Sequence, residues 1–289
     1  MTTVPPFGIR IGPLDITGYG IMLMVGFLVG GWLIDRQLRG KGFNREYAGD
    51  IVVAAVIGGV VGAKLWYVAL HGLDTLLDRG GLVWYGGLVG GALAVTLQGA
   101  RRGVPFRWTA QLVAPGLAAA YALGRIGCFM VGDDYGVPTT AWWGVKFPQG
   151  LPPTTAAGLA TLGWQPPPGT DLATVFAVHP TQLFEVVLMT AAFMVLWRLR
   201  NRPYGTGWLF GLYLVFAGTE RFAIEFIRLK DDRFLSGFTI SQLTSVVLVL
   251  IGVGLMERWK KAGEAPPGPY LARMPEGRKD GRTEGRRAA

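Results

Sequence analysis

Long apolar blocks with few charges alternate with short charged stretches along most of this 289-residue chain. A helix needs about 20 predominantly apolar residues to cross about 30 Å of hydrocarbon, and the longest blocks reach roughly that length. The pattern predicts an all-α integral membrane protein with seven transmembrane helices. The predicted spans are residues 17–35, 48–70, 82–100, 108–128, 180–198, 207–228 and 239–257.

Pairs of glycines four residues apart lie inside two of the predicted spans. Gly58 and Gly62 lie in the second span, and Gly86 and Gly90 lie in the third. Small residues at this spacing allow helix backbones to approach closely in lipid. Because no strand precedes them, we interpret these glycines as packing positions and not as a nucleotide-binding loop.

Lysine and arginine are unevenly distributed between the loops. They are concentrated after spans 1, 3, 5 and 7 and are sparse after spans 2 and 4. Because basic residues mark cytoplasmic loops, the N-terminus should lie outside and the C-terminus in the cytoplasm. Residues 137–178 then form an extracytoplasmic insertion, and proline runs at 152–153 and 166–168 exclude one long helix there. Residues 1–16 lack the features of a cleaved signal peptide, so the first block should be a retained span.

The net charge of +9 is concentrated near the end of the chain. We expect a transmembrane domain over residues 1–259 and a disordered basic tail over 260–289. Next to a membrane, such a tail favours anionic lipid headgroups over nucleic acid. Cys128 is the only cysteine, and His71 and His179 lack the spacing of metal ligands. We therefore expect no metal and no cofactor.

Ionisable residues inside membrane spans are costly and are candidates for function. At 1.5 Å per helical residue, several spans deliver such groups to one layer near the outer surface. The starts of spans 1 and 3, at Tyr19 and Tyr85, fall in the same layer. The charged and polar side chains placed there are Lys64, Arg125, His179, Gln182, Glu185, Arg221, Glu225 and Arg228.

The spacing of these residues predicts shared helix faces. Arg221, Glu225 and Arg228 follow one another at four and three residues, and Gln182 and Glu185 are three apart. The two glutamates do not neutralise the basic residues of this layer, which predicts an anionic guest. A guanidinium group matches phosphate, so a phospholipid headgroup is the expected ligand. In the alternative interpretation, the Arg–Glu pairs only hold helices together.

Three sequence blocks carry a family resemblance. They are Gly124–Gly136 (GRIGCFMVGDDYG), His179–Glu185 (HPTQLFE) and Arg221–Arg228 (RFAIEFIR). In this order they resemble the motifs of the prolipoprotein diacylglyceryl transferases. The Tyr19-Gly20 pair and the Gly86–Gly90 segment also fit, and the family's seven helices and outward N-terminus agree with the topology derived above.

The resemblance implies an enzyme of the bacterial inner membrane, acting as a monomer towards the extracytoplasmic side. It would transfer the diacylglyceryl group of phosphatidylglycerol to the lipobox cysteine thiol of a prolipoprotein and release glycerol phosphate. Arg125 and Arg221 match the two arginines at the headgroup, and Arg125 would bind the phosphate. Other matching positions that would line or support the lipid site are Tyr19, Asp133, Gly136, Gln182, Glu185, Glu225 and Arg228.

The sequence also departs from the family pattern. Cys128 and Val131 stand where asparagines are usual, and Asp133 stands where glutamate is usual. Tyr85 occupies the position of a histidine that has been proposed as a base. Since an ordinary tyrosine is a poor base at neutral pH, Tyr85 could equally donate a hydrogen bond to the substrate. Two other functions stay open: a lipid-binding protein or transporter, and a related transferase with a different acceptor.

Overall fold

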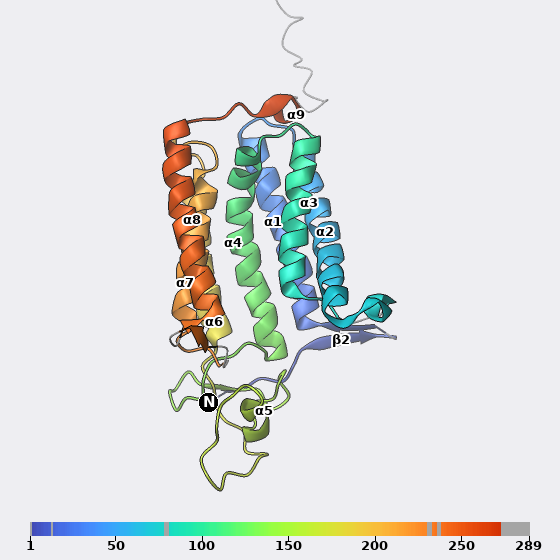
Figure 1. Cartoon of the computed structure of the whole chain (residues 1–289), viewed down its shortest axis with the longest axis vertical. Coiled ribbons are helices and arrows are strands. Elements are labelled where there is room, and N and C mark those ends of the chain that lie inside the picture. Colours follow the sequence, from blue (N-terminus) through green and yellow to red (C-terminus); the bar gives the residue numbers. More distant parts are fainter. Residues whose placement is uncertain (1, 13, 78–80, 230–232, 236–237, 273–289) are drawn as a thin grey trace, which may run out of the picture. The chain divides into compact units, whose positions relative to one another are not determined.

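The computed structural model describes residues 2–12, 14–77, 81–229, 233–235 and 238–272. Every predicted span coincides with a long helix (Figure 1). The long helices are α1 (Gly18–Gly40), α2 (Glu46–His71), α3 (Trp84–Arg101), α4 (Phe106–Val131), α6 (Thr181–Leu199), α7 (Trp208–Ile224) and α8 (Ile240–Ala262).

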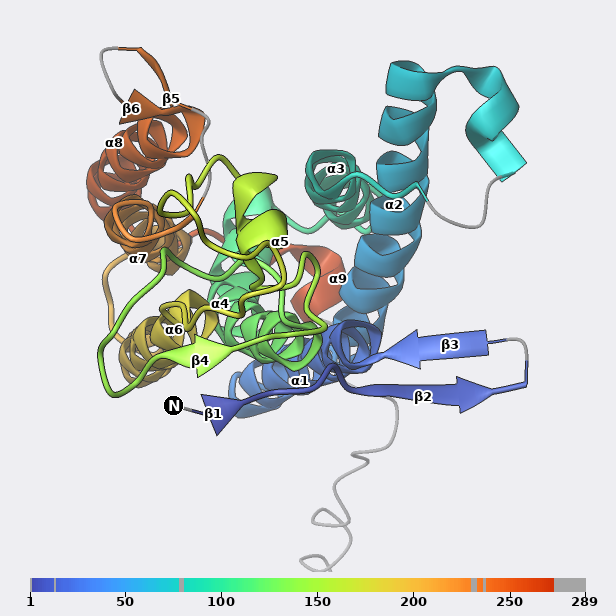
Figure 2. The ribbon, with the colours of Figure 1, turned by 90° about the horizontal axis from the view of Figure 1, so that it is seen from below.

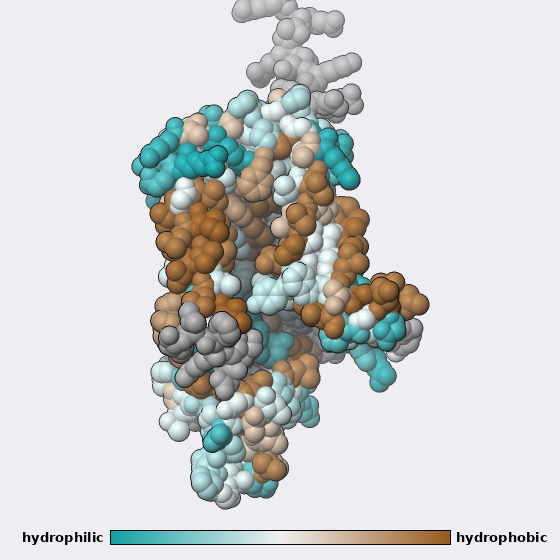
Figure 3. All heavy atoms as spheres, viewed as in Figure 1, coloured by the Kyte–Doolittle hydropathy of each residue, from teal (hydrophilic) through white to brown (hydrophobic). Residues whose placement is uncertain are grey.

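Five of these helices, α1, α2, α4, α6 and α8, are long and apolar enough to cross a membrane. Large apolar side chains are exposed along them, including Leu28, Val60, Leu70 and Leu250. Figure 3 shows hydrophobic surface along the sides of α8 and α3 and hydrophilic residues towards helix ends. Such surface suits lipid and not water. The protein is therefore a multi-pass membrane protein, whereas crossing by α3 and α7 stays a prediction.

Short elements that the hydropathy pattern did not predict connect or extend the helices. The strands form three two-stranded sheets: β2 with β3 and β5 with β6 are antiparallel, and β1 with β4 is parallel (Figure 2). The elements are β1 (Thr2–Thr3), β2 (Gly8–Ile11), β3 (Leu14–Thr17), η1 (Leu73–Leu77), β4 (Val145–Lys146), α5 (Ala156–Ala160), β5 (Arg233–Leu235), β6 (Phe238–Thr239) and α9 (Gly268–Ala272).

The chain divides into two compact units, residues 1–30 with 113–263 and residues 31–112 with 264–289. In the first unit, α7 packs against α6 and α8. Its helical core is built around alanines of α4, with Met189 and Leu196 of α6 and Leu209 of α7 buried against them. Small side chains on α4 let its neighbours approach, and the larger ones fill the space between.

The segment 137–178 forms a cap on the first unit with its own apolar core. The described part contains only the short β4 and α5, so the prediction that no long helix forms here is confirmed. Tyr135, Phe147, Leu159 and Val178 bury their side chains together, and the Tyr135 hydroxyl donates to the Pro152 carbonyl at 2.7 Å. The spacing of apolar residues along the chain could not reveal this core, because most of its members lie outside helices and strands.

In the second unit, α2 and α3 meet at the predicted glycine pairs. A Cβ on Gly62 would lie against the Gly86 carbonyl oxygen and 2.8 Å from the Gly90 Cα, and one on Gly58 would overlap Ala94 and Gly90. The predicted close helix contact is thus confirmed. Only the absence of side chains permits this approach of the two backbones.

Gly62→Leu should separate α2 from α3 and destabilise the protein by at least about 1–3 kcal/mol, the usual cost of overpacking. The apparent melting temperature in detergent measures this. Gly49→Leu on the same helix is the control, because a Cβ on Gly49 meets nothing within 4 Å. Equal melting temperatures for the two variants would contradict the contact.

Residues 260–272, which the prediction assigned to a disordered tail, include the end of α8 and the short helix α9. Helix α8 runs to Ala262, and α9 places Leu271 fully inside the second unit. The Tyr270 hydroxyl donates to Asp50 Oδ2 at 2.9 Å, and Trp108 Nε1 donates to the Ala265 carbonyl at 2.9 Å. Isolated aromatic and apolar residues therefore anchor a stretch that is rich in glycine and proline. Residues 273–289 of the predicted tail lie outside the described residues.

Candidate active site

The end of α4 turns the motif residues back towards the helices. Gly132 has a φ of +71°, and the amides of Gly132 and Asp133 both bond to the Cys128 carbonyl, at 2.9 and 3.2 Å. This is the usual glycine-dependent helix termination. Asp134 follows with a φ of +55°, the only non-glycine residue with a positive φ in the described ranges. Such backbone is strained and is commonest at functional sites.

The start of α6 holds this loop in place. Gln182 Nε2 donates to the Asp133 carbonyl at 2.5 Å, and the Thr181 hydroxyl donates to the Asp134 carbonyl at 2.8 Å. Gln182 and Glu185 are both 0% exposed, which confirms that they share the inner face of α6. The HPTQLFE block therefore supplies both the support for the loop and a buried carboxylate.

Arg125 links α4 to α6 and to the loop. Its Nε donates to the Glu185 carboxylate, and its Nη1 lies 2.9 Å from Asp134 Oδ2. The same Nη1 approaches Cys128 Sγ at 3.5 Å. A guanidinium group has five N–H donors, and in the described part of the chain Nη2 of Arg125 has no hydrogen-bond partner.

Arg221 meets the same carboxylate from α7. Its Nη1 lies 4.0 Å from Glu185 Oε1, and its Nη2 lies 2.6 Å from Glu225 Oε2. Ser241 accepts a hydrogen bond from Nη2 at 3.3 Å. The two arginines predicted to act together are thus brought together by one buried glutamate.

Arg228 does not lie on the helix face expected for it. Helix α7 ends at Ile224, Glu225 is its C-cap, and Arg228 pairs through its backbone with Gly136. Because the chain leaves the helix there, Arg228 does not share a helix face with Arg221, seven residues earlier. The predicted Arg221–Glu225 pair is confirmed. Arg228 reaches the site through Asp134, with which it forms an ion pair, and its Nη1 lies 3.9 Å from Glu225 Oε2.

The predicted surplus of positive charge is wrong. Sequence reasoning counted two glutamates, but Asp133, Asp134 and Glu220 also face the arginines. Five acids therefore surround Arg125, Arg221 and Arg228. Three of these acids form ion pairs with the three arginines. The three paired acids are Asp134, Glu185 and Glu225. An anion must therefore be attracted by unused N–H donors and not by net charge.

Glu220 is a site residue that sequence reasoning left without a role. It is 6% exposed, and neither carboxyl oxygen has a hydrogen-bond partner in the described residues. Its electrostatic neighbours include Glu185, Arg125, Arg221 and Tyr121, whose hydroxyl donates to Glu185 Oε1 at 3.4 Å. Burying a carboxylate without an ion-pair partner is costly.

The two aspartates after α4 differ in their electrostatics. Burial would raise the pKa of Asp134, but Arg228 and Arg125 hold it at about 2. Burial and the neighbouring Asp134 raise the pKa of Asp133 to about 6. Sequence reasoning missed Asp134, although it directly follows Asp133 and a helix-ending glycine, a place where side chains turn back towards the helix.

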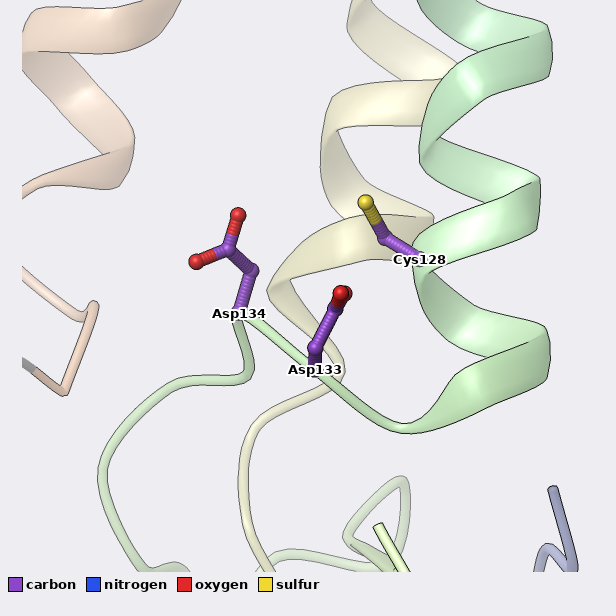
Figure 4. Close-up of side chains that lie close together, drawn as sticks. All are labelled: Cys128, Asp133 and Asp134. Carbon is purple, nitrogen blue, oxygen red and sulfur yellow. The ribbon is translucent and has the colours of Figure 1, made fainter. Parts of the chain in front are cut away.

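Cys128, Asp133 and Asp134 come close enough to hold a cation. Their ligand atoms lie within 4.8 Å of one another, and Figure 4 shows the three side chains at the end of α4. However, Asp134 already pairs with Arg125 and Arg228. Two adjacent guanidinium groups would repel a cation, so we interpret the group as part of the ion-pair network.

Gly136 and Tyr19 lie beside this network in the same unit. A Cβ on Gly136 would lie 2.5 Å from the Ile227 carbonyl oxygen and 2.9 Å from both His179 Cβ and Thr181 Cγ2. Gly136 thus lets three segments meet. Tyr19, at the start of α1, interacts electrostatically with Cys128, Asp133 and Arg125.

Tyr85 and Lys64 belong to the second unit. The Tyr85 side chain is 55% exposed and packs edge-on against Trp84, while the Lys64 ammonium lies 5.3 Å from the centre of the Tyr67 ring. Their membership of the site stays a prediction. An open, mostly apolar pocket of 310 Å³ in the first unit is lined by residues such as Phe7, Arg10, Ile16, Val131 and Leu151, and by none of the three arginines of the ion-pair network.

Comparison with known proteins agrees with the motifs. The family model described as prolipoprotein diacylglyceryl transferase matches residues 6–258. A protein of Nitratidesulfovibrio vulgaris (strain DP4), named phosphatidylglycerol--prolipoprotein diacylglyceryl transferase, is 30% identical over 269 residues, which are 88% of this chain and 94% of the relative. Relatives with the same name from Stenotrophomonas maltophilia (strain R551-3) and Clostridium tetani (strain Massachusetts / E88) are also 30% identical, over 282 and 258 residues. These cover 91% and 86% of this chain and 95% and 96% of the relatives, respectively. The chain, with its three motif blocks gathered around paired arginines, belongs to the prolipoprotein diacylglyceryl transferase family.

Proposed function

We propose that this protein transfers the diacylglyceryl group of phosphatidylglycerol to the lipobox cysteine thiol of a prolipoprotein and releases glycerol phosphate. The observation that carries the proposal is the meeting of Arg125 and Arg221, from two helices, at the Glu185 carboxylate. The family and the names of the relatives support this function over a transporter or a passive lipid-binding protein.

The arginines are fixed by acids, yet they retain donors for a ligand. Arg125 uses Nε and Nη1 on Glu185 and Asp134, which leaves its Nη2 donors for a phosphate oxygen. Arg221 is held by Glu225 through its Nη2 nitrogen. Because guanidinium groups match phosphate geometry, we propose that both bind one headgroup.

The reaction displaces a phosphate ester at the C3 carbon of the diacylglycerol. The sulfur of the acceptor forms a bond to this carbon while the C–O bond breaks. The electron pair of the C–O bond leaves with the phosphate. Charge therefore grows on the phosphate oxygens in the transition state. Donors that are already aimed at that charge lower the barrier, typically by about 3–4 kcal/mol for each.

The location of the reaction follows from the loop charges. We propose that the protein lies in the bacterial inner membrane as a monomer, with residues 137–178 and the arginine network on the extracytoplasmic side. In this orientation the cap lies over the end of α4, where a prolipoprotein would arrive. The basic C-terminal segment would then face anionic lipid headgroups in the cytoplasmic leaflet.

Tyr85 is proposed to donate a hydrogen bond to substrate at the position of the family's histidine. Tyr85→Phe should then lower kcat/KM for transfer by about tenfold, the worth of one hydrogen bond. Steady-state transfer to a lipobox peptide measures this. A loss of a thousandfold or more would contradict a hydrogen-bonding role and would assign proton transfer to Tyr85.

The function itself is tested by release of glycerol phosphate from phosphatidylglycerol by the purified full chain. Release that requires a lipobox peptide, together with a thioether-linked lipid on the peptide cysteine, is the expected result. Release with the same peptide carrying serine instead of cysteine would indicate another acceptor. The absence of release with any peptide would favour the lipid-binding alternative.

A further inference from the structure

Asp133 and Glu220 are the two acids near the motif arginines that form no ion pair among the described residues. The three ion-paired acids of the site are Asp134, Glu185 and Glu225. Among the described residues, Asp133 forms no ion pair within 4.0 Å, and its Oδ1 is buried without a hydrogen-bond partner. An oxygen in this state has a lone pair available for a proton.

The surroundings of Asp133 are those of a thiol site. Cys128 Sγ lies within 4.8 Å of the carboxylate oxygens of Asp133 and Asp134 (Figure 4). Arg125 Nη1, which touches this sulfur at 3.5 Å, also binds Asp134. A sulfur atom therefore already lies between a guanidinium group and carboxylates.

The charged and titratable groups that face Asp133 come from every neighbouring element. The interacting groups are Arg125 and Cys128 on α4, Asp134 in the loop, Arg228 after α7 and Tyr19 on α1. The fully buried Gln182 fixes the backbone by bonding to the Asp133 carbonyl. The carboxylate is thus held at one place, beside the arginines and near the outer end of α4.

We propose that the Asp133 carboxylate is the general base that accepts the proton of the acceptor thiol, a role that rests on the proposed function. The S–H bond breaks, its proton goes to the Asp133 carboxylate, and the electron pair left on sulfur forms the bond to the glycerol C3 carbon. The C–O bond breaks with its electrons on the phosphate. Asp133 then returns its proton to water as glycerol phosphate leaves.

One other acid without an ion pair, Glu220, is a poorer candidate for this role. Glu220 is more deeply buried, and its neighbours belong to the interior of the helices. Asp133 is only half-buried and follows the end of α4, whereas Glu220 lies inside α7. Its pKa of about 6 also matches base catalysis near neutral pH.

The expected pH dependence of kcat/KM follows from the charge state that Asp133 needs as a base. A base must be deprotonated, so kcat/KM of the wild type should be constant above pH 6 and fall tenfold per unit below it. Asp133→Asn should lower kcat/KM at pH 7 by about 10²–10⁴-fold and should remove this acid limb. Its activity should instead rise towards pH 9, as the free thiol ionises with an ordinary pKa of about 8.5.

The experiment uses the full chain in nanodiscs with phosphatidylglycerol and a lipobox peptide. Asp133→Glu should keep the acid limb, and Asp171→Asn, an exposed aspartate of the cap, is the matched control with a wild-type profile. If Asp133→Asn keeps the limb, or loses only substrate affinity at unchanged kcat, the base assignment is wrong. A wild type without any transfer would refute the proposed function instead.

A second measurement changes the nucleophile. A peptide with selenocysteine in place of the lipobox cysteine carries a selenol, which ionises without help at neutral pH. Asp133→Asn should therefore lose less than about tenfold of kcat/KM at pH 7 with this peptide, against the 10²–10⁴-fold loss expected with the thiol peptide. An equal loss with both peptides would show that Asp133 does not accept the thiol proton.

Discussion

Arg125→Ala is expected to lower kcat/KM for transfer by at least about 10²–10³-fold, the typical effect of removing one positioned donor to a developing negative charge. The same loss is expected for Arg221→Ala. Each substitution removes a fork of N–H donors and also leaves Glu185 with one arginine fewer. Release of glycerol phosphate from labelled phosphatidylglycerol measures both variants.

Arg125→Lys distinguishes the role of Arg125 in catalysis from its role in protein stability. A lysine keeps a positive charge beside Glu185 and Asp134 but lacks the planar fork that binds phosphate. We expect this variant to melt near the wild-type temperature while its kcat/KM stays more than tenfold reduced. Wild-type turnover of Arg125→Lys would mean that only charge is needed, and wild-type turnover of both alanine variants would refute the headgroup site.

Glu185→Ala is expected to destabilise the protein by about 3–5 kcal/mol, because it leaves two buried guanidinium groups without their shared carboxylate. Glu185 is 0% exposed and joins Arg125 of α4 to Arg221 of α7. For a chain of this size such a loss lowers the melting temperature by roughly 10 °C. Thermal unfolding in detergent, followed by circular dichroism, measures the effect.

Glu257→Ala is the matched control, because Glu257 is an exposed glutamate on α8. It should melt within about 1 °C of the wild type, as surface substitutions usually change stability by less than 0.5 kcal/mol. If Glu185→Ala melts like this control, the glutamate does not hold the two helices together.

Much of the fold could be predicted because lipid imposes a simple rule. A helix needs an uninterrupted apolar stretch to cross the membrane, so hydropathy located α1 to α8 without α5. The Gly58–Gly62 and Gly86–Gly90 pairs predicted close helix packing for an equally local reason, although not which helices would meet. In contrast, the hairpin β2–β3 and the cap core around Phe147 depend on contacts between segments that no local pattern records.

The site could be predicted only in part. Depth and spacing correctly gathered Arg125, Arg221, Glu185 and Gln182, because each lies near one end of its helix. The partners of Arg228 depend on where α7 ends, and the Asp134 carboxylate reaches two arginines through a left-handed backbone turn. Loop geometry of this kind decided the charge balance, and for this reason the predicted surplus of arginine failed.

The position of the phospholipid phosphate in a cryo-electron microscopy map of the full chain in nanodiscs tests the central claim most directly. The account predicts phosphate density within hydrogen-bonding distance of the guanidinium groups of both Arg125 and Arg221, with Glu185 still between them. Phosphate density elsewhere, with both arginines bound only to their carboxylates, would contradict it.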